Sequence, residues 1–168
     1  MKLIENTFFR EFRAVDGMAD VYQKWNGQGA AFAFVSSSPW QLYLPLSDFL
    51  AKSGFPAASY YLKPFSFKDP SVANVLSEPD EHKLKAIREL LARHPSRRVV
   101  LVGDSGERDP EIYGQVAREN PEQVARILIR RVATDETNDA RFEKAFESVP
   151  AAIWSVFDNA DELPAHID

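Results

Sequence analysis

Short apolar runs alternate with helical patterns along this chain of 168 residues, and this alternation limits the possible folds more than any other feature. Apolar runs typical of buried strands occupy residues 31–35, 60–62, 98–102, 124–129 and 153–157. Helical patterns occupy residues 16–26, 38–53, 80–93, 109–120 and 139–148. Strands that alternate with helices at this spacing predict βαβ units, and therefore an α/β fold in which helices cover both faces of a parallel sheet.

The boundaries of the first two helices are predicted from capping residues. Asp16 is the expected N-cap of the first helix. Ser38 is the expected N-cap of the second helix, with Pro39 at its first position. Pro45 predicts a kink in that helix, and Gly54 predicts its end.

Composition and charge restrict the class of protein. A length of 168 residues with 45% hydrophobic residues predicts one domain, residues 1–168, with a sizeable core. A net charge of −5 argues against a nucleic-acid groove, which needs a basic surface. The sequence has no cysteine, which excludes disulfides and thiolate sites. No apolar stretch is long enough to predict a transmembrane helix and the N-terminus does not look like a signal peptide, so we expect a cytoplasmic protein.

Two carboxylates follow a predicted buried strand in the stretch LVGDSGERDPEIY, at Asp104 and Asp109. Ligands bind beyond the carboxyl ends of strands in open parallel sheets. Asp104 and Asp109 could therefore hold Mg²⁺, which prefers oxygen ligands. The alternative is structural: Asp109 would cap the helix that Pro110 opens, and Asp104 would form a turn with Ser105.

Hydroxyl and amino groups could form a phosphate site at the same edge of the sheet. Ser36 and Ser37 follow the strand AFAFV, where free backbone N–H groups at a helix start would favour an anion. An ordinary helix cap explains these serines equally well. Lys83 could reach a phosphate, although lysines on helices, such as Lys85, are usually solvated.

A Gly-Asp-Ser esterase is a further alternative, because GDSGE contains such a block with Ser105 as its nucleophile. Esterases of that type have the block near the N-terminus and a downstream Asp-x-x-His. Here the block is in mid-chain, and Asp161 and His166 are five residues apart. A role in a turn therefore explains Ser105 better than catalysis does.

These pieces in this order resemble motifs two to four of the haloacid-dehalogenase superfamily. More closely, the chain resembles the catalytic domain of the actin-patch phosphatidate phosphatases over about residues 6–130, in the blocks FVSSSPWQLYLPLSDFL, HKLKAIRELLARHP and VVLVGDSGERDPEIYGQVARENPEQV. The resemblance implies a Rossmann-like parallel sheet and the hydrolysis of phosphomonoesters through an aspartyl-phosphate intermediate. It also implies Mg²⁺ as cofactor, and either a phosphorylated small molecule or a phospholipid as substrate.

The resemblance also implies roles for individual residues. Ser36 would bind the transferring phosphoryl group, together with Ser37. Lys83 would neutralise the charge that develops on that group. Asp104 would coordinate Mg²⁺, with Asp109 supporting it or sharing the metal.

One departure from the family pattern is the missing nucleophile motif, Asp-x-Asp-x-Thr, which does not occur in this sequence. In the superfamily that motif ends the first strand, which lies centrally between the strand with the serine and the strand with the metal aspartate. The chain therefore resembles a domain that starts just after its own nucleophile. We expect it to be inactive alone, and to be poorly stable or to associate with itself. A non-catalytic module that binds phosphate and Mg²⁺ remains the alternative.

Overall fold

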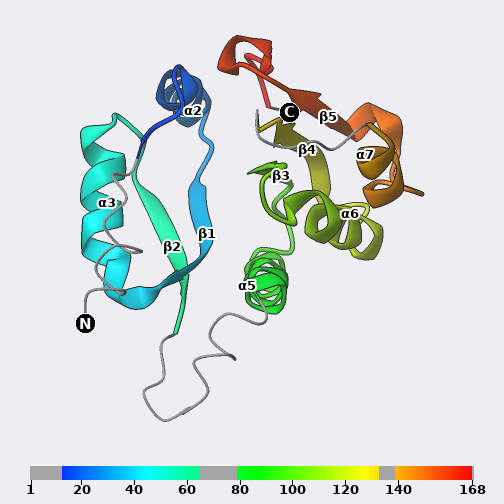
Figure 1. Ribbon diagram of the computed structural model, residues 1–168, viewed down its shortest axis with the longest axis horizontal. Helices are drawn as coiled ribbons and strands as arrows, with labels where there is room; N and C mark the ends of the chain where they lie inside the picture. The colour runs from blue at the N-terminus through cyan, green and yellow to red at the C-terminus, as the bar shows by residue number, and fades with distance from the viewer. Residues whose placement is uncertain (1–12, 65–78, 133–138, 168) are drawn as a thin grey trace.

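The computed structural model describes residues 13–64, 79–132 and 139–167, which form two parallel sheets flanked by helices (Figure 1). The first sheet pairs β1 (Phe32–Pro39) with β2 (Ala58–Lys63). The second has the order β3–β4–β5, with β3 (Val99–Asp104), β4 (Val124–Arg130) and β5 (Trp154–Phe157). All three strand pairs are parallel, so the α/β prediction is confirmed.

Helices connect the strands, as parallel pairing requires. The α-helices are α2 (Met18–Gly27), α3 (Tyr43–Lys52), α5 (Pro79–Arg93), α6 (Asp109–Glu119) and α7 (Asp139–Ala145). Short 3₁₀ turns span Trp40–Leu42, Ala151–Ile153 and Ala160–Glu162. Among the residues with a described structure, no helix has the length and apolar character needed to cross a bilayer.

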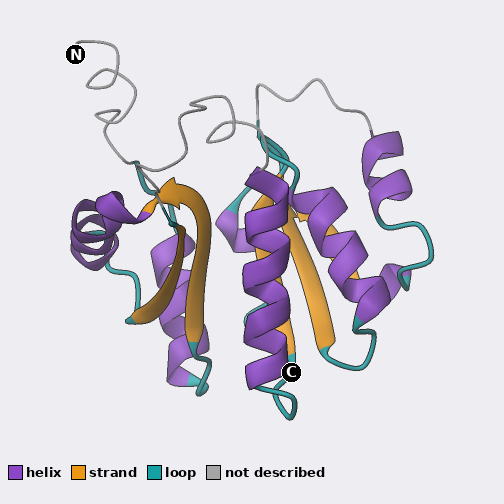
Figure 2. Cartoon of the chain, turned by 90° about the horizontal axis from the view of Figure 1, so that it is seen from below, coloured by secondary structure: helices purple, strands orange, loops and turns teal. Residues whose placement is uncertain are grey.

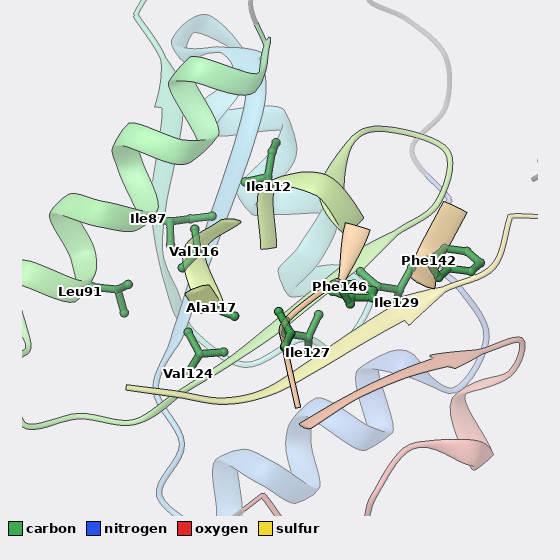
Figure 3. Close-up of a cluster of buried hydrophobic side chains, with 11 residues drawn as sticks. Ile87, Leu91, Ile112, Val116, Ala117, Val124, Ile127, Ile129, Phe142 and Phe146 are labelled. Atoms are coloured by element: carbon green, nitrogen blue, oxygen red, sulfur yellow. The ribbon is translucent and has the colours of Figure 1, made fainter. Parts of the chain in front are cut away.

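The larger core lies between the second sheet and helices α5, α6 and α7 (Figure 3). Ile127 and Ile129 of β4 are fully buried there, and they face Val116 of α6 and Phe142 of α7. Alternate residues of a strand point to opposite faces, so these isoleucines share one face while Leu128 lies on the other. Buried on both faces, β4 has the nearly continuous apolar sequence typical of a central parallel strand.

The opposite face of the second sheet is covered by α2 and the C-terminal segment. Trp25 of α2 is 2% exposed and packs in one cluster with Leu128 and Phe157. The Trp25 indole Nε1 donates a hydrogen bond of 2.9 Å to the carbonyl of Pro164, and Gln28 Nε2 donates one of 2.7 Å to the carbonyl of Ala165. Residues from the two ends of the described chain thus form one core.

The sheets are separated between β1 and β3, which lie beside each other in two views but do not pair (Figures 1 and 2). Helix α5 contacts β1 and also packs on the second sheet through Ile87 and Leu91. On the other face, Tyr22 of α2 stacks on Phe32 of β1 at 5.2 Å between ring centroids. Two helices therefore hold the sheets together where the sequence predicted a missing strand.

The predicted start of the second helix, at Ser38, is wrong. Ser38 does not cap it, because β1 continues to Pro39 and a 3₁₀ turn follows. Helix α3 begins at Tyr43, which places Pro45 in its first turn. Backbone N–H groups of a first turn have no helical partner, so Pro45 needs no kink. The predicted end is confirmed, since Gly54 follows α3 with φ of 83°.

The candidate phosphate and metal site

The candidate site is built on the carboxyl end of β3, where Asp104 is the last strand residue and a tight loop leads to α6 at Asp109. Helix α5 runs beside this loop and contributes Lys83. Sequence reasoning named these three residues, and the fold brings them together. It did not name Glu107, which lies within the same loop and completes the cluster.

Lys83 binds two carboxylates at once. Its Nζ donates a hydrogen bond of 2.7 Å to Asp109 Oδ1 and one of 2.5 Å to Glu107 Oε2. The side chains of Lys83 and Asp109 are 10% and 9% exposed, whereas that of Glu107 is 62% exposed. Lys83 is therefore a buried cation at the strand end, while Lys85 on the same helix has a side chain that is 78% exposed.

Burial and charge oppose each other in this ion pair. Burial by itself would lower the pKa of Lys83, but the Asp109 and Glu107 carboxylates outweigh it and the pKa is raised. Burial also raises the pKa of Asp109, against the attraction of the Lys83 ammonium. Lys83 consequently carries a positive charge at neutral pH. Each member of the Lys83–Asp109 pair compensates the charge of the other, which would be costly to bury alone.

The position of Asp109 depends on a close approach to β3. Its Oδ2 accepts a hydrogen bond of 3.1 Å from the backbone N–H of Asp104. A Cβ on Gly103 would lie 2.4 Å from that Oδ2 and 2.7 Å from Tyr113 Cε2, so only glycine fits there. Arg108 occupies the N-cap position of α6, and no side chain makes a capping hydrogen bond there. Asp109 is therefore turned toward Lys83 and β3 and does not cap α6.

Asp104 forms the turn that the structural alternative predicted, because its Oδ1 accepts a hydrogen bond of 2.8 Å from the N–H of Gly106. Its second oxygen accepts no hydrogen bond from the described residues, which leaves one carboxylate oxygen to meet a cation. Both oxygens of Asp109 are engaged. Within the described ranges, no group of three His, Asp or Glu side chains is arranged to hold a metal. Among these two carboxylates, only Asp104 therefore keeps an oxygen without a described hydrogen bond.

Ser36 and Ser37 lie on β1, in the other sheet. Ser36 pairs with Leu62 of β2, and its hydroxyl accepts a hydrogen bond of 3.1 Å from the backbone N–H of Ser38. No hydrogen bond among the described residues joins Ser36 to Lys83. The expected partners in phosphate binding therefore lie on different elements, Ser36 on β1 and Lys83 on α5, with no described hydrogen bond between them.

Ser105 has a structural role. It is 2% exposed, its hydroxyl accepts a hydrogen bond of 3.0 Å from the N–H of Val132, and its own N–H donates to the carbonyl of Arg130 at 2.9 Å. These bonds tie the loop to the end of β4. Asp161 and His166 are exposed, so nothing in this arrangement supports the esterase alternative.

Two curated relatives resemble this chain. Uncharacterized protein C29B5.04c of Schizosaccharomyces pombe is 32% identical over 124 residues, which are 73% of this chain and 20% of that protein. Phosphatidate phosphatase APP1 of Saccharomyces cerevisiae is 28% identical over 131 residues, which are 76% of this chain and 22% of that protein. The chain thus spans about a fifth of the length of these relatives.

Among solved structures, the crystal structure of PytH_H230A aligns with a TM-score of 0.35 and 18% identity. The alignment covers 62% of this chain and 42% of that one, and the likeness is too slight to bear on fold or function. The family comparison is decisive, because residues 1–131 match the model of the phosphatidate phosphatase APP1 catalytic domain and include every residue of the candidate site. The chain belongs to the phosphatidate phosphatase APP1 catalytic domain family.

Proposed function

We propose that this chain carries the phosphate-binding and Mg²⁺-binding part of a phosphatase site that hydrolyses phosphomonoesters of the phosphatidate type. Family membership supports this reaction class, since residues 1–131 match the phosphatidate phosphatase APP1 catalytic domain. The observation that carries the proposal is the buried Lys83–Asp109 pair at the carboxyl end of β3, beside Asp104.

Lys83 is suited to hold a phosphoryl group. An ammonium has three N–H donors, and two of them are used by Asp109 and Glu107. No described residue accepts the third, which can donate to a phosphate oxygen. Phosphoryl transfer depends mainly on positioning and on charge stabilisation, and a fixed, partly desolvated cation provides both.

Asp104 is the residue that would hold Mg²⁺, through the carboxylate oxygen that its turn leaves open. Mg²⁺ is usually bound by one or two carboxylates with waters and substrate phosphates, so a single protein ligand suffices. When bound, the ion supplies a positive charge that attracts and orients the phosphate. Asp109 keeps Lys83 and the Asp104 backbone in place at the same strand end.

The nucleophile is the part that this sequence does not contain, because it has no Asp-x-Asp-x-Thr motif. In the proposed reaction, a carboxylate at the missing position would attack phosphorus and displace the alcohol of the phosphomonoester, which forms an aspartyl-phosphate. Water would then hydrolyse this intermediate, which releases inorganic phosphate and restores the carboxylate. We therefore expect the 168-residue chain to bind phosphate and Mg²⁺ without turnover. A module that only binds, and never participates in catalysis, is the second candidate function.

Calorimetric titration with inorganic phosphate, with and without Mg²⁺, tests the site directly. We expect Mg²⁺ to strengthen phosphate binding, and Lys83→Met to weaken it at least tenfold because the fixed cation is lost. Lys85→Met is the matched control, since the Lys85 side chain is exposed on the same helix. Asp104→Asn should remove the effect of Mg²⁺ and leave metal-free binding nearly unchanged.

The outcomes separate the two candidates. If the wild-type chain binds neither phosphate nor Mg²⁺, or if Lys83→Met and Lys85→Met behave alike, the proposed site is refuted. Release of phosphate from phosphatidate vesicles should be measured on this chain and on a fusion that adds an Asp-x-Asp-x-Thr strand ahead of residue 1. Mg²⁺-dependent turnover by the fusion supports the phosphatase. Binding without turnover by either protein supports the binding module.

A further inference from the structure

We infer that Arg141 of α7 is a positioning residue that fixes the loop between β3 and α6, and thereby sets the geometry of Asp104, Asp109 and Lys83. This inference deepens the proposed function. It rests on that function for the claim that the loop serves phosphate and Mg²⁺ binding, whereas the contacts of Arg141 are observed independently. Arg141 lies beyond residues 1–131, the part that matches the family model. The family resemblance therefore gives it no role.

The guanidinium of Arg141 binds two backbone carbonyls of the loop and one carboxylate of α6. Its Nη1 donates a hydrogen bond of 2.7 Å to the carbonyl of Ser105, and its Nη2 donates one of 2.6 Å to the carbonyl of Glu107. Its Nε and Nη2 also bind the two carboxylate oxygens of Glu111, at 2.8 and 3.1 Å. One planar group thus connects Ser105 and Glu107 of the loop to the first turn of α6.

Both loop residues that Arg141 contacts are next to, or bonded to, a residue of the candidate site. Ser105 directly follows Asp104 in the chain. Glu107 accepts from Arg141 with its backbone carbonyl and from Lys83 with its side chain. A displacement of the loop at this point would move the second carboxylate partner of Lys83 away from it.

The loop needs such contacts because it has little secondary structure of its own. Residues 105–108 form turns that belong to no helix or strand, and three of them are exposed. Backbone carbonyls in such a loop have no partner in secondary structure, so an arginine can satisfy two of them with fixed geometry. The Arg141 side chain is only 21% exposed, so the surrounding residues restrict its position.

Lysine cannot replace this arginine, because an ammonium is a compact charge and lacks the fork of donors that reaches two carbonyls and a carboxylate together. Arg141→Lys therefore keeps the charge and removes these contacts. Arg118→Lys is the matched control: Arg118 also joins α6 to the α7 region, by donating to the carbonyls of Ala145 and Glu147, but it donates no described hydrogen bond to the loop.

The test compares these two variants with the wild-type chain by amide hydrogen exchange, urea unfolding and calorimetric titration with Mg²⁺ and inorganic phosphate. The amides of Asp104 and Gly106 report on the loop, because each donates to a carboxylate that flanks it, that of Asp109 or of Asp104. In Arg141→Lys we expect these two amides to exchange at least tenfold faster and both ligands to bind about tenfold more weakly. In Arg118→Lys we expect the exchange of these two amides and the affinities for both ligands to stay unchanged, although the loss of stability in urea is similar to that of Arg141→Lys.

Two results would overturn the positioning role: equal exchange of the Asp104 and Gly106 amides in the two variants, or faster exchange that only follows global unfolding. A third result separates this inference from the proposed function. If the wild-type chain binds no phosphate or Mg²⁺ but only Arg141→Lys loosens the loop, the proposed function fails while Arg141 is still confirmed as the positioning residue of the loop.

Discussion

At the scale of single residues, Lys83 and Asp109 form a buried ion pair in which the loss of either side chain destabilises the other. Lys83→Met would leave the Asp109 carboxylate buried without its cation, and removing one partner of a buried pair costs about 3–5 kcal/mol. Lys85→Met should change the free energy of unfolding by less than about 0.5 kcal/mol, because it is an exposed position. Urea unfolding at pH 7 measures both values.

The pH dependence of the Lys83→Met variant follows from Asp109. Burial raises the pKa of this carboxyl, and removing the opposing ammonium raises it further. A folded-state pKa above the unfolded value favours folding once the carboxyl is protonated. The destabilisation should therefore shrink as the pH falls from 7 toward 4. A loss of stability that is the same at both pH values would show that Asp109 is not the cause.

Gly103 is the second residue on which the site depends. In Gly103→Ala the new Cβ would overlap Asp109 Oδ2 and Tyr113, so the helix start must shift away from β3. Forcing an extra carbon into such a contact costs about 1–3 kcal/mol. Gly27→Ala is the control, since nothing lies within 4 Å of its Cβ position and alanine favours a helix by about 1 kcal/mol. Opposite signs of the two changes in urea midpoint would confirm the prediction.

At the scale of elements, α6 and α7 pack so closely that a glycine is required between them. A Cβ on Gly114 of α6 would lie 2.1 Å from the carbonyl oxygen of Ala145 at the end of α7. Gly114→Ala should therefore push α7 outward and weaken the α6–α7 contact by more than about 2 kcal/mol, because a backbone atom cannot rotate away. Hydrogen exchange of the amides in α7 should rise in this variant. Exchange at the wild-type rate would contradict the packing described.

The elements themselves were largely predictable, because every strand and helix arises from an apolar period that the sequence displays. The errors occur where a local signal had a second meaning. Ser38-Pro39 predicts a helix start, but β1 continues through these residues, because Pro39 lies at the strand end where its missing N–H is not needed. The position of Asp109 before Pro110 is typical of a helix cap, whereas its carboxylate binds Lys83, which is distant in sequence.

The candidate site was predictable only in part, for a related reason. Lys83, Asp104 and Asp109 lie at strand or helix ends that a parallel sheet brings to one edge, and the sequence order shows this. Arg141 has no such signal. It lies 30 residues or more from the loop residues it binds, and arginines are frequent on helix surfaces. Only the docking of α7 against α6 reveals its contacts.

At the scale of the whole molecule, the separation between β1 and β3 is the feature with the largest consequence. Each of these strands has a paired edge and, within the described residues, an edge with no strand beside it. Unpaired strand edges expose rows of N–H and C=O groups, which other strands can bind. Ser36 and Asp104 lie on the two strands concerned, so the separation of the sheets and the separation of the candidate site have the same cause.

We therefore expect the 168-residue chain to be marginally stable or to associate through these edges. A central strand of five apolar residues would contribute on the order of 10 kcal/mol at about 1.5–3 kcal/mol per residue. This is comparable to the total stability of a domain, about 5–15 kcal/mol. Sedimentation velocity and thermal unfolding over a hundredfold range of concentration should show either oligomers whose melting temperature rises with concentration, or a monomer that unfolds at low temperature. A monomer that melts cooperatively at 50 °C or above, independently of concentration, would show that α2 and α5 suffice to hold the two sheets together.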